Sequence, residues 1–151
     1  MPLREDINAA LKDAMKSGDK TRMATMRLIN AAIKDRDIEA RGAGKDPLSD
    51  AELLQLFQKM IKQRQESAQI YEDNGRAELA TQEREEIRHI SSFMPKQMDE
   101  AETKAAIEAV VKELGASGLK DMGKVMGELK ARYAGKMDFG KANGVLKAVL
   151  S

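Results

Sequence analysis

The sequence of 151 residues contains no cysteine and no tryptophan, and only 3% of its residues are aromatic. Without cysteine the chain can form no disulfide bond, no thiolate metal site and no cysteine nucleophile. The interior must therefore be built from Leu, Ile, Val, Ala and ten Met, and cores of that kind are usually helical. A chain of this length makes one ordinary domain or two small ones and can bury a real core.

Long hydrophobic runs are missing as well. No window reaches the roughly 18 apolar residues that a membrane-spanning helix needs, and the N-terminal stretch MPLREDINAALKDAMK has no uninterrupted apolar run of the signal-peptide kind. We therefore expect a cytoplasmic protein with no membrane contact. The single histidine, His89, has no second His or Cys with which to hold a metal, and we expect it at the surface or at the boundary of the core. We expect no metal and no other cofactor.

Net charge is also small, at +1, but its distribution along the chain is uneven. From Leu119 to the C-terminus there are seven bases against three acids, a net charge of +4, so the first 118 residues carry −3. A basic terminal region on a mildly acidic body is weak evidence for nucleic-acid contact, because many helical domains show a similar imbalance.

Apolar residues at helical spacing predict four helices in residues 1–94. Their ends are predicted by turn and capping signals: Ser17-Gly18, a cap at Asp19, a loop at Gly42–Pro47, a capping box at Ser49–Glu52 and a stop at Asn74-Gly75. Four helices with short connections predict an antiparallel bundle.

Three polar residues lie in line with apolar neighbours on different helices of this bundle: Asn30, Arg64 and Glu83. They could form a catalytic or ligand-binding cluster. Alternatively, they could belong to a buried or half-buried polar network in which Arg64 pairs with Glu83 or Glu86 and fixes the register of the helices. We favour the polar network.

Residues 95–98 are expected to link the bundle to a second domain, because Pro95 disfavours helical geometry in Met94. Asp99 and Glu102 then supply a second capping signal, and the helical patterns that follow predict three helices over residues 99–151. The fold class is therefore all-α, with an N-terminal four-helix domain and a small C-terminal domain.

The middle helix of the second domain is the most informative stretch. If Asp121 caps it, one apolar stripe faces the core: Met122, Val125, Met126, Leu129 and Tyr133. Lys124 then points the opposite way, with Gly127 and Lys130 on one flank. Glycine costs about 1 kcal/mol relative to alanine inside a helix, and Gly123 and Gly127 are two such residues. Either another helix packs across these glycines, or a phosphate or a partner surface approaches them.

Six motifs, in their order and spacing, resemble those of the GatB/YqeY family, in its stand-alone YqeY form, over essentially the whole chain: RLINAAIK at 27–34, KQRQES at 62–67, GRAELA at 75–80, FMPKQM at 93–98, DMGKVMG at 121–127 and GKMDFG at 135–140. The resemblance implies an all-helical protein with a C-terminal domain similar to the tail of the GatB component of the glutamine-dependent aspartyl/glutamyl-tRNA amidotransferase, which holds the tRNA. A related module is fused to some glutaminyl-tRNA synthetases.

The family label implied by this resemblance is carbon–nitrogen ligase activity with glutamine as amido donor. Such a reaction needs a nucleophile that releases ammonia and a nucleotide site. The sequence has no Cys, no amidase-like Gly-Ser segment with a partnering lysine, no GxxxxGK[ST] loop and no carboxylate cluster with magnesium spacing. We therefore expect a binding protein without catalytic residues of its own.

The resemblance implies tRNA as a partner, together with a tRNA-dependent amidotransferase or an aminoacyl-tRNA synthetase, and we expect a monomer. The matching positions are Gly123, Lys124, Gly127, Gly135 and Lys136, and the further RNA-binding candidates are Lys120, Lys130 and Lys141. The lysines would neutralise phosphates, and Gly123 and Gly127 would let backbone approach backbone. The alternative is a protein-interaction module that docks a partner on the same glycine-bearing face and has no role with RNA.

Two bulky residues depart from the usual family pattern, Met137 and Phe139, and their size would narrow the contact surface. Tyr133 and Phe139 fall on apolar stripes, so we expect no base stacking. Any recognition should then be of RNA shape and backbone.

Overall fold

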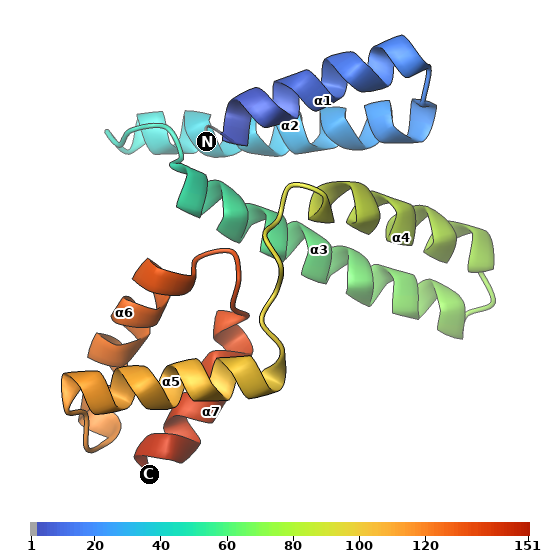
Figure 1. The fold of residues 1–151 in the computed structure, drawn as a ribbon. Coiled ribbons are helices and arrows are strands. Elements are labelled where there is room, and N and C mark those ends of the chain that lie inside the picture. The colour runs from blue at the N-terminus through green and yellow to red at the C-terminus, as the bar shows by residue number, and fades with distance from the viewer. Residues whose placement is uncertain (1–2) are drawn as a thin grey trace. The chain divides into compact units, whose positions relative to one another are not determined.

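The computed structural model describes residues 3–151, which form seven α-helices, one short 3₁₀ helix and no β-strand. The all-α prediction is confirmed. In chain order (Figure 1) the elements are α1 (Leu3–Ser17), α2 (Lys20–Gly42), α3 (Asp50–Asp73), α4 (Ala77–Ser91), α5 (Glu100–Leu114), η1 (Leu119–Asp121), α6 (Met122–Tyr133) and α7 (Phe139–Leu150). They gather into two compact units, an N-terminal unit, Met1–Met94, and a C-terminal unit, Pro95–Ser151.

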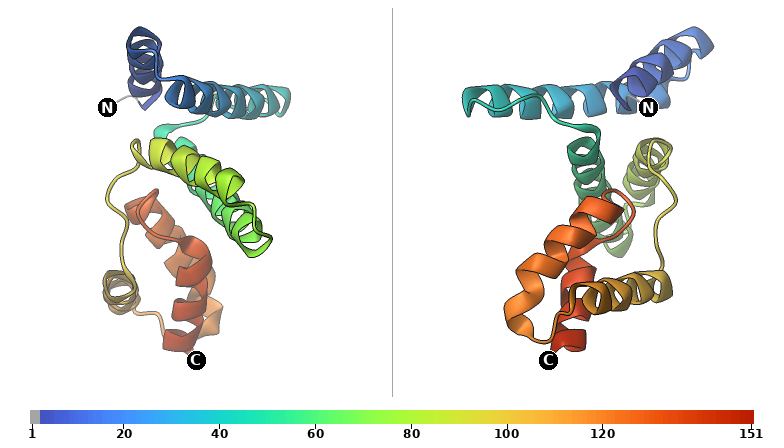
Figure 2. Two further views of the ribbon diagram at one scale, coloured as in Figure 1. Left: turned by 90° about the vertical axis from the view of Figure 1, so that its right-hand side faces the viewer. Right: turned by 60° about the vertical axis from the view of Figure 1, so that its left-hand side comes forward.

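The N-terminal unit consists of two helical hairpins. α2 packs against α1 in the first hairpin, and α4 packs against α3 in the second. Figure 2 shows both hairpins from two further sides. α4 also packs against α2, so both hairpins share one core. The buried core residues follow helical spacing on each helix: Leu3, Ile7, Met26, Ile29, Ile33, Leu53, Phe57, Met60 and Ile90. The rings of Phe57 and Phe93 add a tilted contact, with their centroids 6.3 Å apart.

The ends of these helices follow local chemistry. The Asp19 side chain caps α2 by accepting a hydrogen bond from the Arg22 backbone N–H at 3.0 Å. At the start of α3, Ser49 and Glu52 form the predicted capping box. Gly18 follows α1 with a φ of 72°, a left-handed conformation that favours glycine. The predicted loop is one residue shorter than expected, because α2 continues to Gly42.

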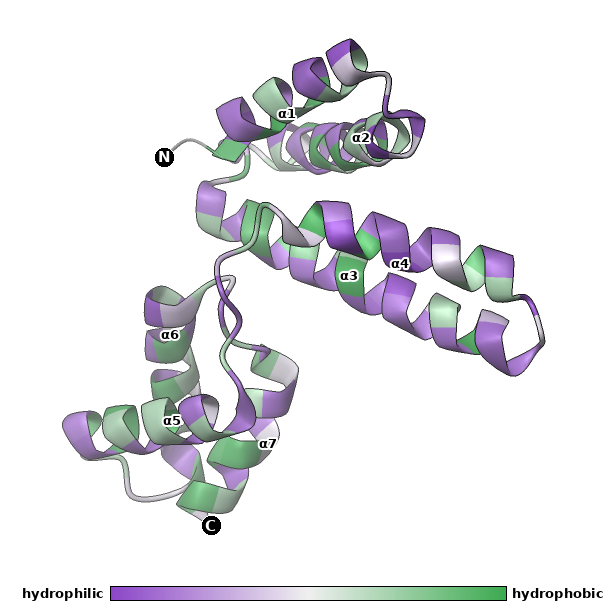
Figure 3. Ribbon diagram, turned by 45° about the vertical axis from the view of Figure 1, so that its right-hand side comes forward, coloured by the Kyte–Doolittle hydropathy of each residue, from purple (hydrophilic) through white to green (hydrophobic). Residues whose placement is uncertain are grey.

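In the C-terminal unit α5, α6 and α7 pack against one another pairwise. Hydrophobic and hydrophilic residues alternate in bands along these helices (Figure 3), as expected for helices with one buried face. The buried core comprises Ala106, Ile107, Val110, Val125, Leu129, Met137, Ala142, Leu146 and Leu150. A capping box of Asp99 and Glu102 opens α5, and the Asp138 carboxylate accepts hydrogen bonds from the N–H groups of Gly140 and Lys141 at the start of α7.

Over residues 3–151, every helix is too short or too polar to cross a membrane.

Candidate nucleic-acid interface

Half of the candidate residues lie on α6, whose apolar stripe faces the core as predicted. Val125 and Leu129 are fully buried, and Met122, Met126 and Tyr133 pack against the same core while remaining partly exposed. Since a helix has 3.6 residues per turn, the opposite face must point to solvent. Gly123, Lys124, Gly127 and Lys130 are all exposed.

Asp121 does not cap α6 with its side chain, which corrects the sequence-based expectation. Its carboxylate instead accepts a hydrogen bond from the backbone N–H of Ser117 at 3.0 Å. The reason is that η1 runs directly into α6, so Asp121 already has helical backbone geometry (φ −90°, ψ −1°) and its side chain reaches back to the preceding loop. The hydrogen bond from Ser117, followed by one from Gly118 and the charges of Lys120 and Lys124, holds the pKa of Asp121 below its ordinary value.

The acids around α6 are mostly engaged. Glu128 accepts from Arg132 at 2.7 Å, and Arg132 also pairs at 2.7 Å with Glu113 of α5. This network joins α6 to α5 and removes Arg132 from the free bases. By contrast, Lys124 and Lys130 have no acidic side chain within 4.0 Å in residues 3–151. Apart from the Asp121 carboxylate, the outer face of α6 therefore presents uncompensated positive charge.

The two helical glycines of α6 are open to solvent. A Cβ atom added to Gly123 or to Gly127 would meet no neighbouring atom within 4 Å. Within the described C-terminal unit, no other helix packs across the glycines, which was one of the two interpretations left open by the sequence. The outer face is instead a shallow, exposed strip of backbone flanked by lysines.

The remaining candidates lie at the other end of α6. Gly135 is buried in the turn to α7, with a φ of 77°, and its carbonyl accepts a hydrogen bond from the side chain of Gln97. The Lys136 carbonyl accepts from the Met98 N–H at 2.8 Å, which ties the turn to residues 95–98, while the Lys136 side chain is exposed. Gly135 therefore has a structural role, because it gives the turn its left-handed backbone conformation. Lys141 is exposed on the first turn of α7.

The candidates thus form two groups. Lys120 precedes α6 and Lys124 and Lys130 follow on it, whereas Lys136 and Lys141 come after its C-terminal end. The 12 residues of α6 rise about 18 Å at 1.5 Å per residue.

Met137 and Phe139 do not narrow this surface. Met137 is fully buried, and Phe139 packs against the core of the C-terminal unit. Their bulk therefore contributes to the interior, Met137 from the turn after α6 and Phe139 from the first residue of α7.

The polar residues predicted in the N-terminal unit are only partly brought together. Arg64 Nε lies 2.9 Å from Glu86 Oε2, and both side chains are largely buried between α3 and α4. Glu83 lies close enough for its pKa to be raised, chiefly by burial and then by the charge of Glu86, with Arg64 opposing. Arg64 and Glu86 therefore form an ion pair with Glu83 nearby, and the structural role of this group stays a prediction. Asn30 lies instead on the wall of a pocket beside α2.

His89 is buried, with 6% of its surface exposed, which corrects the expectation of a surface or boundary position. α4 packs against both α2 and α3, so its buried face is wider than the single stripe that the sequence pattern indicated. The His89 Nε2 atom has no hydrogen-bond partner in the part of the chain that the structure describes. Within that part no group of three or more His, Asp or Glu side chains is arranged to hold a metal ion.

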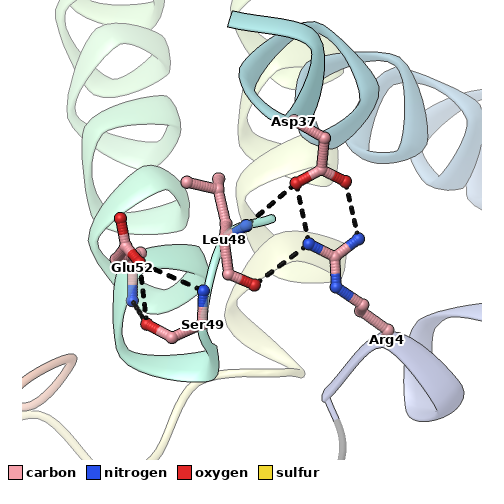
Figure 4. Close-up of polar contacts among 5 residues, drawn as sticks. All are labelled: Arg4, Asp37, Leu48, Ser49 and Glu52. Carbon is pink, nitrogen blue, oxygen red and sulfur yellow. Dashed lines mark hydrogen bonds and ion pairs between the residues drawn. The ribbon is translucent and has the colours of Figure 1, made fainter. Parts of the chain in front are cut away.

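A further polar cluster was not indicated by the sequence pattern. The two terminal nitrogens of Arg4 each lie 2.8 Å from an oxygen of Asp37, and one of them also donates to the Leu48 carbonyl at 3.0 Å (Figure 4). The Leu48 N–H in turn donates to Asp37 at 3.0 Å. The Arg4 hydrogen bond holds the pKa of Asp37 below its ordinary range. We call Arg4, Asp37 and the Leu48 backbone the latch, because they join α1, α2 and the loop before α3.

A family model described as Yqey-like protein matches residues 4–150. Among curated proteins, the chain is similar to "Altered inheritance of mitochondria protein 41, mitochondrial" of Lachancea thermotolerans, with 34% identity over 114 residues, covering 74% of this chain and 59% of that protein. The protein of the same name from Eremothecium gossypii is 34% identical over 84 residues, covering 56% of this chain and 44% of that protein. The chain spans about half the length of the curated relatives it matches.

Proposed function

This chain belongs to the YqeY-like family, and we propose that its C-terminal unit binds tRNA and serves as an accessory module to a tRNA-dependent enzyme. In this proposal residues 99–151 are the tRNA-binding domain, residues 95–98 are its linker, and residues 1–94 are a helical bundle that carries it. The relatives are named as mitochondrial proteins. For this chain we propose a cytoplasmic location, as expected from its sequence.

The observation that carries the proposal is the charge on the outer face of α6. Lys124 and Lys130 are exposed and have no acidic group within 4.0 Å in residues 3–151, although Asp121 interacts with the charge of Lys124 at longer range. The acid on the same helix, Glu128, is neutralised by Arg132. Exposed lysines that are not paired with acids are free to replace the counterions of a phosphate backbone. Lys120, Lys136 and Lys141 would extend the same contact beyond the two ends of α6.

The chemistry of this surface favours backbone and shape recognition. Tyr133 and Phe139 pack against the core, so neither offers a free ring on which a base could stack. Gly123 and Gly127 carry no side chain that would hold a phosphate away from the helix. We therefore propose that the protein recognises a folded RNA and contacts about four phosphates.

The proposed role is binding, with the chemistry supplied by another protein. By the family resemblance that protein is a tRNA-dependent amidotransferase, which uses glutamine as amido donor, or an aminoacyl-tRNA synthetase. This chain has no cysteine with which to release ammonia from glutamine. A pure preparation that released ammonia from glutamine or from amide substrates would contradict the proposal.

The test is a titration of the full-length protein with folded tRNA at a series of salt concentrations. About four phosphate contacts predict that the logarithm of the association constant falls with the logarithm of the salt concentration with a slope of about −3 to −4. Absence of binding at low salt, or a slope near zero, would exclude the proposed contact.

A second candidate is supported by the open space over Gly123 and Gly127. A flat strip of helix backbone would also suit the close approach of a helix from a partner protein, such as a component of the amidotransferase. Protein binding of this kind would be nearly insensitive to salt and would be lost in Gly127→Leu. Retention of the partner by Gly127→Leu in a pull-down experiment would reject it.

A further inference from the structure

The N-terminal unit contains a pocket of about 450 Å³ that the proposed function does not use. It lies between the start of α1, the second half of α2 and the loop that follows α2. Pockets that hold small molecules occupy about 300–1,000 Å³, so its size suits a ligand of modest dimensions.

Four bases and one acid line this pocket, and only one of the bases is neutralised. Arg4 is committed to Asp37 and to the Leu48 carbonyl through the latch. Lys34, Arg41 and Lys45 have no acidic partner within 4.0 Å in the chain from residue 3 to residue 151. Three free cations around one pocket favour a ligand with more than one negative charge.

The helix dipole explains only part of this arrangement. A base in the last turn of a helix is stabilised by the partial negative charge there, and Arg41 occupies that position in α2. Lys34 lies about two turns earlier, and Lys45 belongs to the loop, so the dipole effect, which fades within one turn, does not account for them.

The lining of the pocket also has apolar residues. Ile33 is buried, and Ile38 is 59% exposed on the same face of α2 as Lys34 and Arg41. Pro47 adds a third apolar residue, and the half-buried amide of Asn30 adds one donor and one acceptor group. The lining therefore suits a ligand that combines an anionic group with an apolar part.

The latch gives the pocket a defined shape before any ligand arrives. Asp37 binds both Arg4 and the Leu48 N–H, and the Leu48 carbonyl is bound by Arg4 (Figure 4). The end of the loop that carries Lys45 and Pro47 is thereby fixed to α1 and α2. A pocket held in this way loses little conformational entropy when it binds.

We propose that this pocket binds a nucleoside monophosphate unit, either as a free nucleotide or as the terminal nucleotide of an RNA. The phosphate meets Lys34, Arg41 and Lys45, and the nucleoside lies against the apolar residues Ile38 and Pro47. The proposal is independent of tRNA binding by α6, because the pocket belongs entirely to the N-terminal unit.

The experiment is a calorimetric titration of the full-length protein with the four common ribonucleoside 5′-monophosphates, their nucleosides and inorganic phosphate. We expect one-to-one binding of at least one monophosphate, with its nucleoside and phosphate alone each at least tenfold weaker, because each engages only part of the lining. A terminally phosphorylated linear oligoribonucleotide and its circular form are then tested as competitors of the bound monophosphate. Their competition distinguishes an RNA end from a free nucleotide as the ligand. Competition by the linear form alone identifies an RNA end as a ligand, and competition by neither form identifies the free nucleotide.

The variants test the roles of the charged and the apolar lining residues separately. Lys34→Gln/Arg41→Gln should weaken monophosphate binding at least tenfold, whereas Lys12→Gln/Arg76→Gln, which removes the same charge from exposed positions outside the pocket, should not. Ile38→Ser should weaken the monophosphate but not inorganic phosphate. No saturable binding of any monophosphate at millimolar concentration, equal loss in the two double variants, or inorganic phosphate binding as tightly as the nucleotide would each overturn the proposal.

Discussion

The Arg64–Glu86 ion pair between α3 and α4 leads to a sharp prediction about stability. Arg64 and Glu86 expose only 17% and 14% of their side chains, and the pair is 2.9 Å long. Arg64→Met keeps most of the aliphatic stem but leaves Glu83 and Glu86 together without a base. Breaking a fully buried pair costs about 3–5 kcal/mol. Because these side chains retain some contact with water, we expect the variant to lose about 2–3 kcal/mol of unfolding free energy at pH 7.

The loss should depend on pH in a defined direction. Burial, followed by the charge of Glu86, already raises the pKa of Glu83, and Arg64 opposes that rise. A carboxyl group whose pKa is higher in the folded state makes the protein less stable as the pH rises from its unfolded pKa through its folded pKa. Without Arg64 the pKa of Glu83 rises further, so the cost of Arg64→Met should grow between about pH 4.5 and pH 7.

The assay is urea unfolding of both proteins across that pH range, monitored with a probe of the N-terminal unit. In thermal unfolding at pH 7, the midpoint of that unit should fall by about 10–20 °C, at about 4–8 °C per kcal/mol. Arg84→Met is a matched control, because the Arg84–Glu72 pair also joins α3 and α4 but exposes 49% and 42% of its side chains, and it should cost at most about 1 kcal/mol. Equal losses in the two variants, or a loss that shrinks as the pH rises, would refute this reasoning.

Three further predictions concern the latch, the outer face of α6 and the core. Asp37→Asn should lower the unfolding free energy by about 1–2 kcal/mol at pH 7, because it replaces one oxygen that accepts from Arg4 or Leu48 by an NH₂ donor and removes the charge that strengthens the remaining bonds at a partly exposed site. Since the pKa of Asp37 is lowered in the folded state, the difference between variant and parent should shrink as the pH of a urea titration falls below 3.8. Gly127→Ala should raise the unfolding free energy by up to about 1 kcal/mol, because the added Cβ meets no neighbour and the helix gains propensity; a decrease in denaturant experiments would count against the open surface. Leu129→Ala should cost about 2–5 kcal/mol, because the side chain is fully buried; a loss below about 1 kcal/mol would contradict that burial.

Local chemistry made the helix ends predictable from the sequence. Capping boxes such as Ser49 with Glu52 use groups three residues apart, so composition and spacing alone reveal them. Asp121 shows where this fails. It has the right residue type for a cap, but η1 precedes it and the Ser117 N–H competes for its carboxylate. The backbone geometry that decides between these partners is not encoded by residue type.

Burial and long-range pairing were harder to predict. His89 is buried because α4 is covered by two other helices, and a single-helix pattern cannot reveal the second neighbour. Arg4 and Asp37 are 33 residues apart, and neither belongs to an apolar stripe that would have drawn attention to the pair. Gly135 is a similar case, since its turn is fixed by Gln97, a residue 38 positions away.

The solvent-facing side of α6 followed from helical periodicity, because one apolar stripe determines where Lys124 and Lys130 point. What those lysines bind does not follow from periodicity. The presence of exposed lysines is common to many helical proteins, so the tRNA assignment depends on family resemblance and on the lack of an ion pair within 4.0 Å for Lys124 and Lys130 in residues 3–151, and it stays a prediction.

The most direct measurement of the central claim is tRNA affinity at low salt for the parent, for Lys124→Glu/Lys136→Glu and for Lys104→Glu/Lys112→Glu. The second pair reverses two exposed lysines on α5 of the same unit, so the change in net charge is identical. Our account predicts that the first variant binds at least tenfold more weakly, with a salt slope smaller by about two, while the second stays close to the parent. Failure of the parent to bind tRNA, or equal weakening of the two variants, would contradict it.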